Sequence, residues 1–228
     1  MKKTIGIIGM GRFGISLTES FAKNNVDVLA LDYRKDRIER ASLFTDYTIV
    51  CDSTNEDALK ESGIKDCDHV IVAFGQEEDM NIATTIVTVI RLKALGINKI
   101  TVRVDDESFV DTMHLIGADD IIFPLKIASE KIANRITSDS VIDYFKMTDS
   151  FDAYEIELKK EFREIPIVEL NARSKYYINI LVIIRNGEKL VPNKESVLKP
   201  KDHLIIFGRK KDINKIINFF DTFIWQRW

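Results

Sequence analysis

The sequence predicts an α/β protein in which a doubly wound parallel sheet is followed by a small α+β domain. Two features of the first 137 residues predict the sheet: short β-branched runs alternate with segments of helical periodicity, and a glycine-rich turn follows the first run. A change to strand alternation from about residue 150 predicts the second domain. We expect domains at 1–125 and 149–228, joined by a helical crossover linker at 126–148.

Six β-branched runs are the expected strands of the first domain, and the segments between them have a period of 3.6 residues. The runs are TIGII (4–8), DVLALD (27–32), YTIVC (47–51), HVIVAF (69–74), KITVRV (99–104) and DIIF (120–123). The best-defined helix covers 77–96, with acidic residues at its start and Gly96 at the left-handed position after its end.

The segment after Pro124 has a helical pattern through residue 147 that is interrupted at 137–140 by TSDS, where Ser and Asp favour a cap or a break. We place the domain junction at this break. Beyond it, 153–158, 178–185 and 203–208 are expected strands, and Asn186–Gly187 is a hairpin signal. The last segment, 212–228, carries its apolar residues on one helical face, which predicts a core or dimer-interface helix, with contact to a membrane protein or membrane surface as the alternative.

Composition excludes several classes of protein. The chain has 228 residues, with 33 Lys and Arg against 36 Asp and Glu, so no excess positive charge is available to neutralise a nucleic acid backbone. No run reaches the roughly 18 apolar residues of a membrane span, and the start resembles a strand more than a signal peptide. Cys51 and Cys67 have no metal-ligand or CxxC spacing, and we expect no metal site.

The stretch IGIIGMGRFG, residues 5–14, predicts a nucleotide site because its GxGxxG motif follows a strand and opens a helix. Gly9 permits the tight turn, Gly11 lets the main chain approach a phosphate, and Gly14 allows the helix to pack on the strand. The helix N-terminus adds free N–H groups and positive potential. Asp32 ends the next strand about 20 residues on, where a carboxylate can accept hydrogen bonds from a ribose.

The residues around the motif also limit which nucleotides can bind. Asp32 would repel the 2′-phosphate of NADP, which leaves NAD or an adenosine phosphate, and Arg12 favours a ligand that ends in phosphate because a guanidinium can bind its oxygens in a bidentate manner. CDST (51–54) and AFG (73–75) follow strands and therefore lie at the carboxyl edge of the sheet. The predicted nucleotide-binding residues are Gly9, Gly11, Arg12, Phe13, Gly14, Asp32, Tyr33, Asp52, Ser53, Thr54, Ala73, Phe74, Gly75 and Arg103.

A binding module is preferred over an enzyme. His69, His114 and His203 are far apart in the sequence, and each is more typical of a structural or surface residue than of a catalyst. The chain lacks a Tyr followed four residues later by Lys, a Walker lysine motif, a serine nucleophile elbow and an HExxH motif. The alternative is a small NAD(H)-dependent oxidoreductase or an NAD(H) redox sensor on the same fold.

With GMGRFG, Asp32, CDST, the AFG strand end and IGADDIIFP in this order, the chain resembles the RCK proteins, the cytosolic regulatory subunits of bacterial Ktr and Trk potassium uptake systems. The resemblance implies a Rossmann-like first domain that binds ATP or ADP, with NAD possible, and dimers assembled into an octameric ring. It also implies a cytoplasmic position at the inner face of the membrane, held there by a membrane-embedded K⁺-transporting subunit. Arg12 matches the family arginine that reaches the γ-phosphate across the dimer interface.

The resemblance implies expectations for two further segments, one at a cation site and one at a second ligand site. Many Ktr relatives have a glutamate where FPLK (123–126) has Leu125, so we expect a weakened or absent cation site between subunits, because a leucine offers no oxygen ligand. The stretch 167–181 resembles the segment that binds cyclic di-AMP, although Asn171 replaces the usual aspartate. The predicted contacts are Ile167, Val168, Asn171, Ala172, Arg173, Asn179, Ile180 and Leu181.

Overall fold

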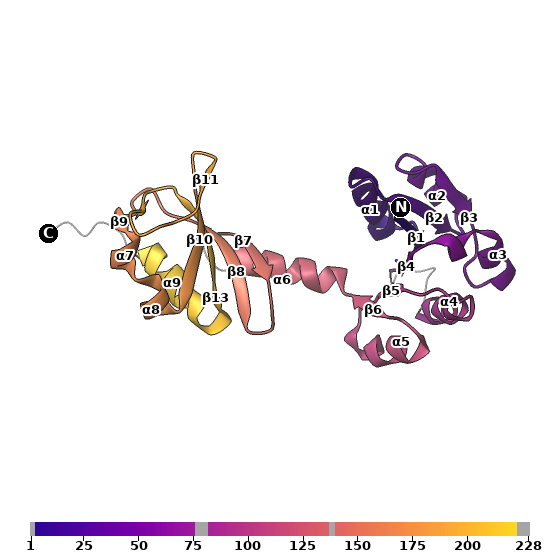
Figure 1. Cartoon of the computed structure of the whole chain (residues 1–228). Coiled ribbons are helices and arrows are strands. Elements are labelled where there is room, and N and C mark those ends of the chain that lie inside the picture. The colour runs from indigo at the N-terminus through magenta and orange to yellow at the C-terminus, as the bar shows by residue number, and fades with distance from the viewer. Residues whose placement is uncertain (1–2, 76–81, 137–139, 223–228) are drawn as a thin grey trace. The chain divides into compact units, whose positions relative to one another are not determined.

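The computed structural model describes residues 3–75, 82–136 and 140–222, and the chain divides into two compact units, residues 1–126 and 127–228 (Figure 1). Among the described helices, none is long and apolar enough to cross a membrane. Each unit has its own sheet and its own hydrophobic core.

The first unit is a six-stranded parallel sheet in the order β3-β2-β1-β4-β5-β6. This is the strand order of a doubly wound Rossmann-like fold, and it confirms the predicted fold class. The strands are β1 (Thr4–Ile8), β2 (Asp27–Asp32), β3 (Tyr47–Val50), β4 (His69–Val72), β5 (Ile100–Arg103) and β6 (Asp120–Ile122). The helices are α1 (Arg12–Lys23), α2 (Lys35–Ala41), α3 (Glu56–Glu61), α4 (Ile82–Ala94) and α5 (Val110–Ile116), with short 3₁₀ turns at Ile64–Asp66 and Glu107–Phe109. Helix α6 (Pro124–Ile136) begins in this unit, and from Ile127 onward it belongs to the second unit.

Two clusters of buried side chains hold the helices to this sheet. One cluster joins strand residues such as Ile7 and Ala30 to α1 and α2, and the other joins Val72 and Val102 to α3, α4 and α5. The order of the strands reverses between β1 and β4, so the carboxyl ends of these two strands frame a crevice where ligands bind in such folds.

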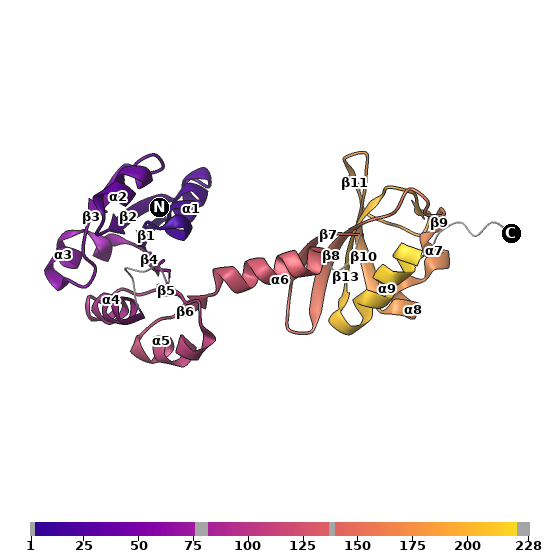
Figure 2. The same cartoon turned by 180° about the vertical axis from the view of Figure 1, so that it is seen from behind.

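The second unit is a five-stranded antiparallel sheet in the order β11-β10-β13-β8-β7, with helices packed on it and a separate two-stranded pair β12-β9. Figure 2 shows α9 lying against the sheet. Its strands are β7 (Val141–Lys146), β8 (Phe151–Glu157), β9 (Ile165–Pro166), β10 (Ile178–Arg185), β11 (Glu188–Leu190), β12 (Val197–Leu198) and β13 (His203–Arg209). Its helices are α7 (Ile167–Leu170), α8 (Ala172–Tyr176) and α9 (Lys210–Thr222).

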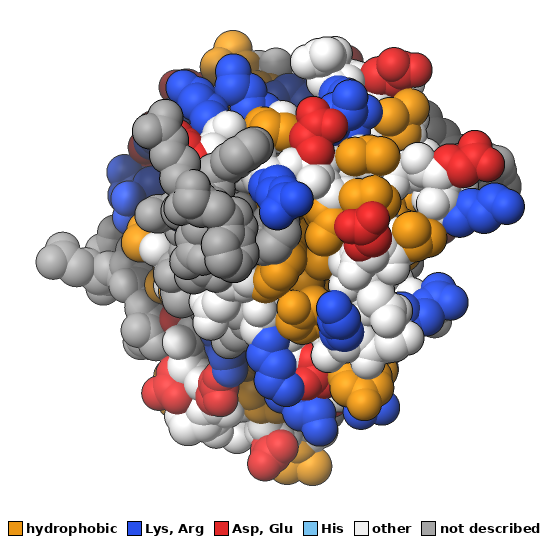
Figure 3. All heavy atoms as spheres, turned by 90° about the vertical axis from the view of Figure 1, so that its left-hand side faces the viewer, with side chains coloured by type: hydrophobic (Ala, Val, Ile, Leu, Met, Phe, Trp, Pro, Cys, Tyr) orange, Lys and Arg blue, Asp and Glu red, His pale blue; other side chains and the backbone are white. Residues whose placement is uncertain are grey.

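The expected hairpin and final helix are both present in this unit. Asn186 and Gly187 have φ of 52° and 83°, and they join β10 to β11. Ile213, Ile216 and Phe220 of α9 are fully or almost fully buried, so this helix is part of the core. Residues 223 and 224, which were expected on the same face, lie outside the described residues. Figure 3 shows hydrophobic side chains gathered on one face among charged ones.

The crossover linker differs from its prediction. Helix α6 ends at Ile136, and Val141–Lys146 forms strand β7 instead of the helical segment expected after the break at 137–140. The reason is pairing with β8, a contact that helical periodicity does not reveal. The acidic start expected for the helix at 77–96, and residues 137–139 of the expected break, lie outside the described residues.

Candidate functional site

The glycine turn between β1 and α1 forms the centre of the candidate site. Gly9 has φ of 99°, and its N–H donates to the carbonyl oxygen of Leu31 at 2.8 Å, which ties the turn to β2. A Cβ on Gly14 would lie only 1.9 Å from the carbonyl oxygen of Gly9. Gly11 precedes α1 without a side-chain cap, so the first N–H groups of this helix are available to an anion.

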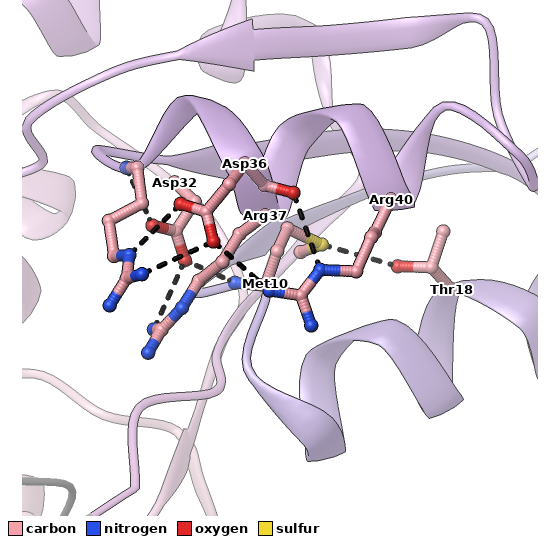
Figure 4. Close-up of polar contacts among 7 residues, drawn as sticks. Met10, Thr18, Asp32, Asp36, Arg37 and Arg40 are labelled. Carbon is pink, nitrogen blue, oxygen red and sulfur yellow. Dashed lines mark hydrogen bonds and ion pairs between the residues drawn. The ribbon is translucent and has the colours of Figure 1, made fainter.

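Asp32 holds this turn through hydrogen bonds, and its side chain does not face open solvent. Its side chain is fully buried (0% exposed), and its two oxygens accept hydrogen bonds from the main-chain N–H of Met10 at 2.6 Å and of Arg34 at 2.9 Å. The guanidinium of Arg37 lies 3.7 Å from the same carboxylate (Figure 4). The charge of Asp32 is therefore compensated within the chain, and the carboxylate fixes the shape of the turn.

A cavity of about 600 Å³ opens at the turn, where the strand order reverses. We call it the turn cavity. It brings together eight of the predicted residues: Gly9, Gly11, Arg12, Phe13, Ala73, Phe74, Gly75 and Arg103. Four more complete its lining: Arg37, Asp105, Pro124 and Leu125. Three guanidinium groups and one carboxylate thus line a space beside free helix N–H groups, which suits phosphate oxygens.

Arg103 is held firmly at the edge of the turn cavity. Its Nε and Nη2 bind the two carboxylate oxygens of Asp105 at 3.1 and 2.9 Å, and its guanidinium lies 5.3 Å from the centre of the Phe13 ring. A Cβ on Gly75 would lie 3.1 Å from Nη1 of Arg103. The arginine is thereby positioned before any ligand enters, which reduces the entropy lost on binding.

Arg12 differs from Arg103 because it is exposed and its side chain makes no hydrogen bond or ion pair with another described residue. It is the first residue of α1, so its charge stands beside the uncapped N–H groups of that helix. A free, always-charged guanidinium at the cavity mouth is suited to binding the terminal phosphate of a ligand in this cavity, or a phosphate of a ligand that is bound outside it.

A second, smaller cavity of about 230 Å³ adjoins the first, and Phe74 lines both. We call it the strand-end cavity. It collects the other predicted residues except Gly14: Asp32, Tyr33, Asp52, Ser53 and Thr54, together with Ile8, Cys51 and Thr84. Asp52 accepts hydrogen bonds from the N–H and hydroxyl of Thr54 at 2.9 and 2.7 Å, and Ser53 bonds Thr88 at 2.8 Å. The polar groups of this loop are thus fixed at the carboxyl ends of β2 and β3.

A third cavity, about 500 Å³, lies in the C-terminal unit. It is lined by Ile167, Val168, Asn171, Ala172, Arg173, Asn179 and Ile180 of the predicted set, and by Ile178, Pro192, Asn193 and Lys194. Leu181 is not part of this lining and is 45% exposed. The guanidinium of Arg173 donates from Nε to the amide oxygen of Asn179 at 2.8 Å, so Asn179 orients this arginine, whose orienting carboxylate was expected to be missing.

The histidines are all outside these cavities. His69 begins β4 at the opposite edge of the sheet and bonds the hydroxyl of Thr101 at 2.7 Å, and its burial lowers its pKa. His114 bonds the carbonyl oxygen of Ala118, and His203 pairs with Glu155 at 3.2 Å. Each histidine therefore has a structural partner, and none lines the turn cavity or the strand-end cavity.

Two polar residues of the turn cavity were not predicted. Arg37 lies five residues after Asp32 in the first turns of α2, and a positive charge at that spacing is the sequence signal that predicts it. Asp105 lies two residues after Arg103, and alternation along an extended segment places both side chains on one side. Leu125 does line the cavity, is 62% exposed and offers no oxygen to a cation.

Known proteins match this chain over nearly its whole length. The TrkA-N domain model matches residues 5–124, and the TrkA-C domain model matches residues 154–221. The chain is 34% identical to "Ktr system potassium uptake protein C" of Bacillus subtilis (strain 168), covering 94% of this chain and 96% of that protein. It is 31% identical to "Ktr system potassium uptake protein A" of the same organism, covering 95% and 96%.

A structural similarity extends to a channel protein. The structure of the GsuK channel bound to NAD aligns with a TM-score of 0.63 and 15% sequence identity, over all of this chain and 40% of that chain. At this level of identity, the similarity concerns the fold alone.

Proposed function

The chain belongs to the Ktr and Trk family of potassium uptake proteins, as a regulatory subunit built from a TrkA-N and a TrkA-C domain, and we propose that it gates a membrane-embedded K⁺-transporting subunit in response to ATP and ADP. In this proposal the chain is a cytoplasmic component held at the inner face of the membrane by its partner. Its homodimers assemble into an octameric ring.

The observation that carries the proposal is the turn cavity, with its three arginines and free helix N–H groups at the point where the strand order reverses. The adenosine of the nucleotide lies toward the strand-end cavity, next to Tyr33 and Asp52, and its phosphates lie over the glycine turn. Phe74 stands between the two parts because it lines both cavities.

Gating requires only a difference in contacts between the two nucleotides. ATP and ADP can shift an equilibrium between two ring states only through interactions that differ in those states. Arg12 supplies such an interaction, because its free guanidinium can bind the γ-phosphate of a nucleotide in a neighbouring subunit, and only ATP has this phosphate. No hydrolysis is needed for this, and we propose that the chain is not an enzyme.

We further propose that the C-terminal cavity binds cyclic di-AMP and lowers K⁺ uptake. A two-fold symmetric dinucleotide suits a two-fold dimer in which each protomer offers one arginine to a phosphate. Arg173 is that arginine, and the aliphatic side chains of Ile167 and Ile180 supply apolar contact for a base. The amide of Asn179 keeps the guanidinium in place without adding a negative charge beside the phosphate.

The test combines binding and transport. The full-length chain is titrated with ATP, ADP, NAD and NADH by calorimetry, and it is then reconstituted with its membrane subunit in vesicles to measure K⁺ flux with each nucleotide. We expect binding of ATP and ADP without turnover and a flux that differs between the two. Equal flux with both nucleotides contradicts the gating role, and tight binding of NAD(H) with none of ATP or ADP favours a redox sensor or oxidoreductase instead.

A further inference from the structure

A further cavity of about 540 Å³ lies at the amino edge of the parallel sheet, beside the edge strand β3. We call it the edge cavity. Leu29, Tyr47, Ile49 and Cys67 supply the apolar part of its lining. It shares no lining residue with the turn cavity or the strand-end cavity, which lie at the opposite edge of the sheet. Its role is therefore separate from nucleotide binding.

The edge cavity carries negative charge. Its described lining includes the carboxylates of Asp27, Asp46 and Asp66 and no basic side chain. Asp46 and Asp66 are exposed, and neither side chain makes a hydrogen bond or an ion pair with another described residue. Burial, together with the charges of Asp66 and Asp68, raises the pKa of the Cys67 thiol to about 11, so this thiol is neutral at pH 7. The cavity thus offers carboxylates beside an apolar surface to a cation with an apolar stem.

The strand beside the cavity has an open edge. Among the described strands, β3 is last in the order of the sheet and pairs only with β2 (Figure 1). Cys51, directly after β3, donates its N–H to the carbonyl oxygen of Asp32 at 2.9 Å. Because alternate residues of a parallel strand bond to the same neighbour, Thr48 and Val50 direct their main-chain groups to the open edge. Such an edge can add a strand from another chain.

We propose that a basic segment of the membrane-embedded subunit adds to β3 as an extended strand and places a Lys or Arg side chain in the edge cavity. The inference rests on the proposed function, which supplies that partner. Cytoplasmic loops of membrane proteins carry an excess of Lys and Arg, so such a segment complements Asp46 and Asp66. The aliphatic stem of the side chain lies on Leu29 and Ile49, and its charged end lies beside the carboxylates and the Tyr47 ring.

Charge favours this partner over two others. A second copy of the chain that met this edge through a two-fold axis would bring two sets of the same carboxylates together, and like charges repel. Nucleic acids and anionic lipid surfaces are repelled by Asp46 and Asp66 for the same reason. A basic protein segment is the partner that gains from both the charge and the open strand edge.

The experiment measures binding of the full-length chain to its membrane subunit in phosphatidylcholine vesicles, by co-sedimentation at fixed ionic strength. Asp46→Asn combined with Asp66→Asn should weaken binding about tenfold or more, and added salt should weaken the binding of this variant less than that of the parent. Val50→Pro should weaken binding about threefold or more, because it removes an outward N–H at a position where an edge strand tolerates proline. Both variants should bind ATP and ADP within about twofold of the parent, because the changes lie outside the turn cavity and the strand-end cavity.

Asp57→Asn combined with Asp111→Asn is the matched control, because it removes the same charge from two exposed residues that do not line the edge cavity. It should leave binding to the vesicles within about twofold of the parent. Unchanged binding in the carboxylate variant or in Val50→Pro overturns the inference, and so does an equal loss in the control.

Sedimentation of the chain without its membrane subunit tests the other occupant. A change of oligomeric state in the carboxylate variant overturns the inference and assigns the open edge of β3 to a second copy. If the parent binds the vesicles and the variants bind equally well, the proposed function stands and only this inference fails. If the parent does not bind vesicles that carry the membrane subunit, both fail.

Discussion

Replacing Arg12 by alanine separates the two nucleotides that the proposed switch must distinguish. The side chain is exposed and pairs with no other described residue, so its loss should change the free energy of unfolding by less than about 0.5 kcal/mol. A charge-assisted contact with a γ-phosphate contributes about 1.5–3 kcal/mol. The dissociation constant for ATP should therefore rise about 10- to 150-fold, while that for ADP should change by less than about threefold.

The assay is calorimetric titration of parent and variant with both nucleotides, alongside thermal unfolding to confirm that the fold is intact. Lys23→Ala serves as the control, because Lys23 lies at the other end of α1, pairs with Glu19 on the surface and lines neither nucleotide cavity. It should leave both affinities unchanged. Equal losses of ATP and ADP affinity in the Arg12 variant would refute the γ-phosphate role, and so would no loss at all.

Four further outcomes follow from the same structure. Gly14→Ala should lower stability by about 1–3 kcal/mol, because the new Cβ would meet the carbonyl oxygen of Gly9 at 1.9 Å, and it should abolish nucleotide binding; an unchanged denaturation midpoint contradicts this. In Leu125→Glu the affinity for ATP should increase when Mg²⁺ is added, because the new carboxylate supplies oxygen ligands at the cavity. If Mg²⁺ already increases the ATP affinity of the parent strongly, other residues supply those ligands and the prediction is wrong. Arg173→Ala should abolish cyclic di-AMP binding and leave ATP binding intact, and calorimetry of a variant that binds like the parent would rule the site out. Burial lowers the pKa of His69 in the folded chain, so the unfolded chain takes up a proton first as the pH falls through about 6.5. The free energy of unfolding of the parent should therefore decrease below that pH, and it should decrease less steeply in His69→Gln. Parallel curves of stability against pH for the two proteins would refute this.

The shape of the candidate site was predictable wherever its cause is local. The glycine spacing predicts the turn because Gly9 needs a positive φ and Gly14 a missing Cβ, and both requirements act within a few residues. The gathering of 51–54 and 73–75 at one edge follows from the parallel sheet. The burial of Asp32 could not be read from the sequence, because it depends on how the turn closes over β2 and on Arg37 from α2.

The C-terminal unit was less predictable because its pairing is less local. Apolar residues in the segment Val141–Lys146 fit a helical period as well as a strand, and only the pairing with β8 decides between them. The segment before β10 forms two short helices, which end at Asn171 and Tyr177 because these residues adopt φ of 48° and 57°. The orienting role of Asn179 arises from this same local geometry.

The separate hydrophobic cores of the two units bear on how such a protein can diversify. Buried residues such as Ile8 and Leu92 belong to the first unit, and Ile156 and Phe162 belong to the second, so each ligand cavity rests on its own packing. Substitutions at distant sites that share no partners have nearly additive effects on stability. Mutations that alter the cavity of one unit therefore impose little stability penalty on the other, and a lineage can change one cavity while it retains the other.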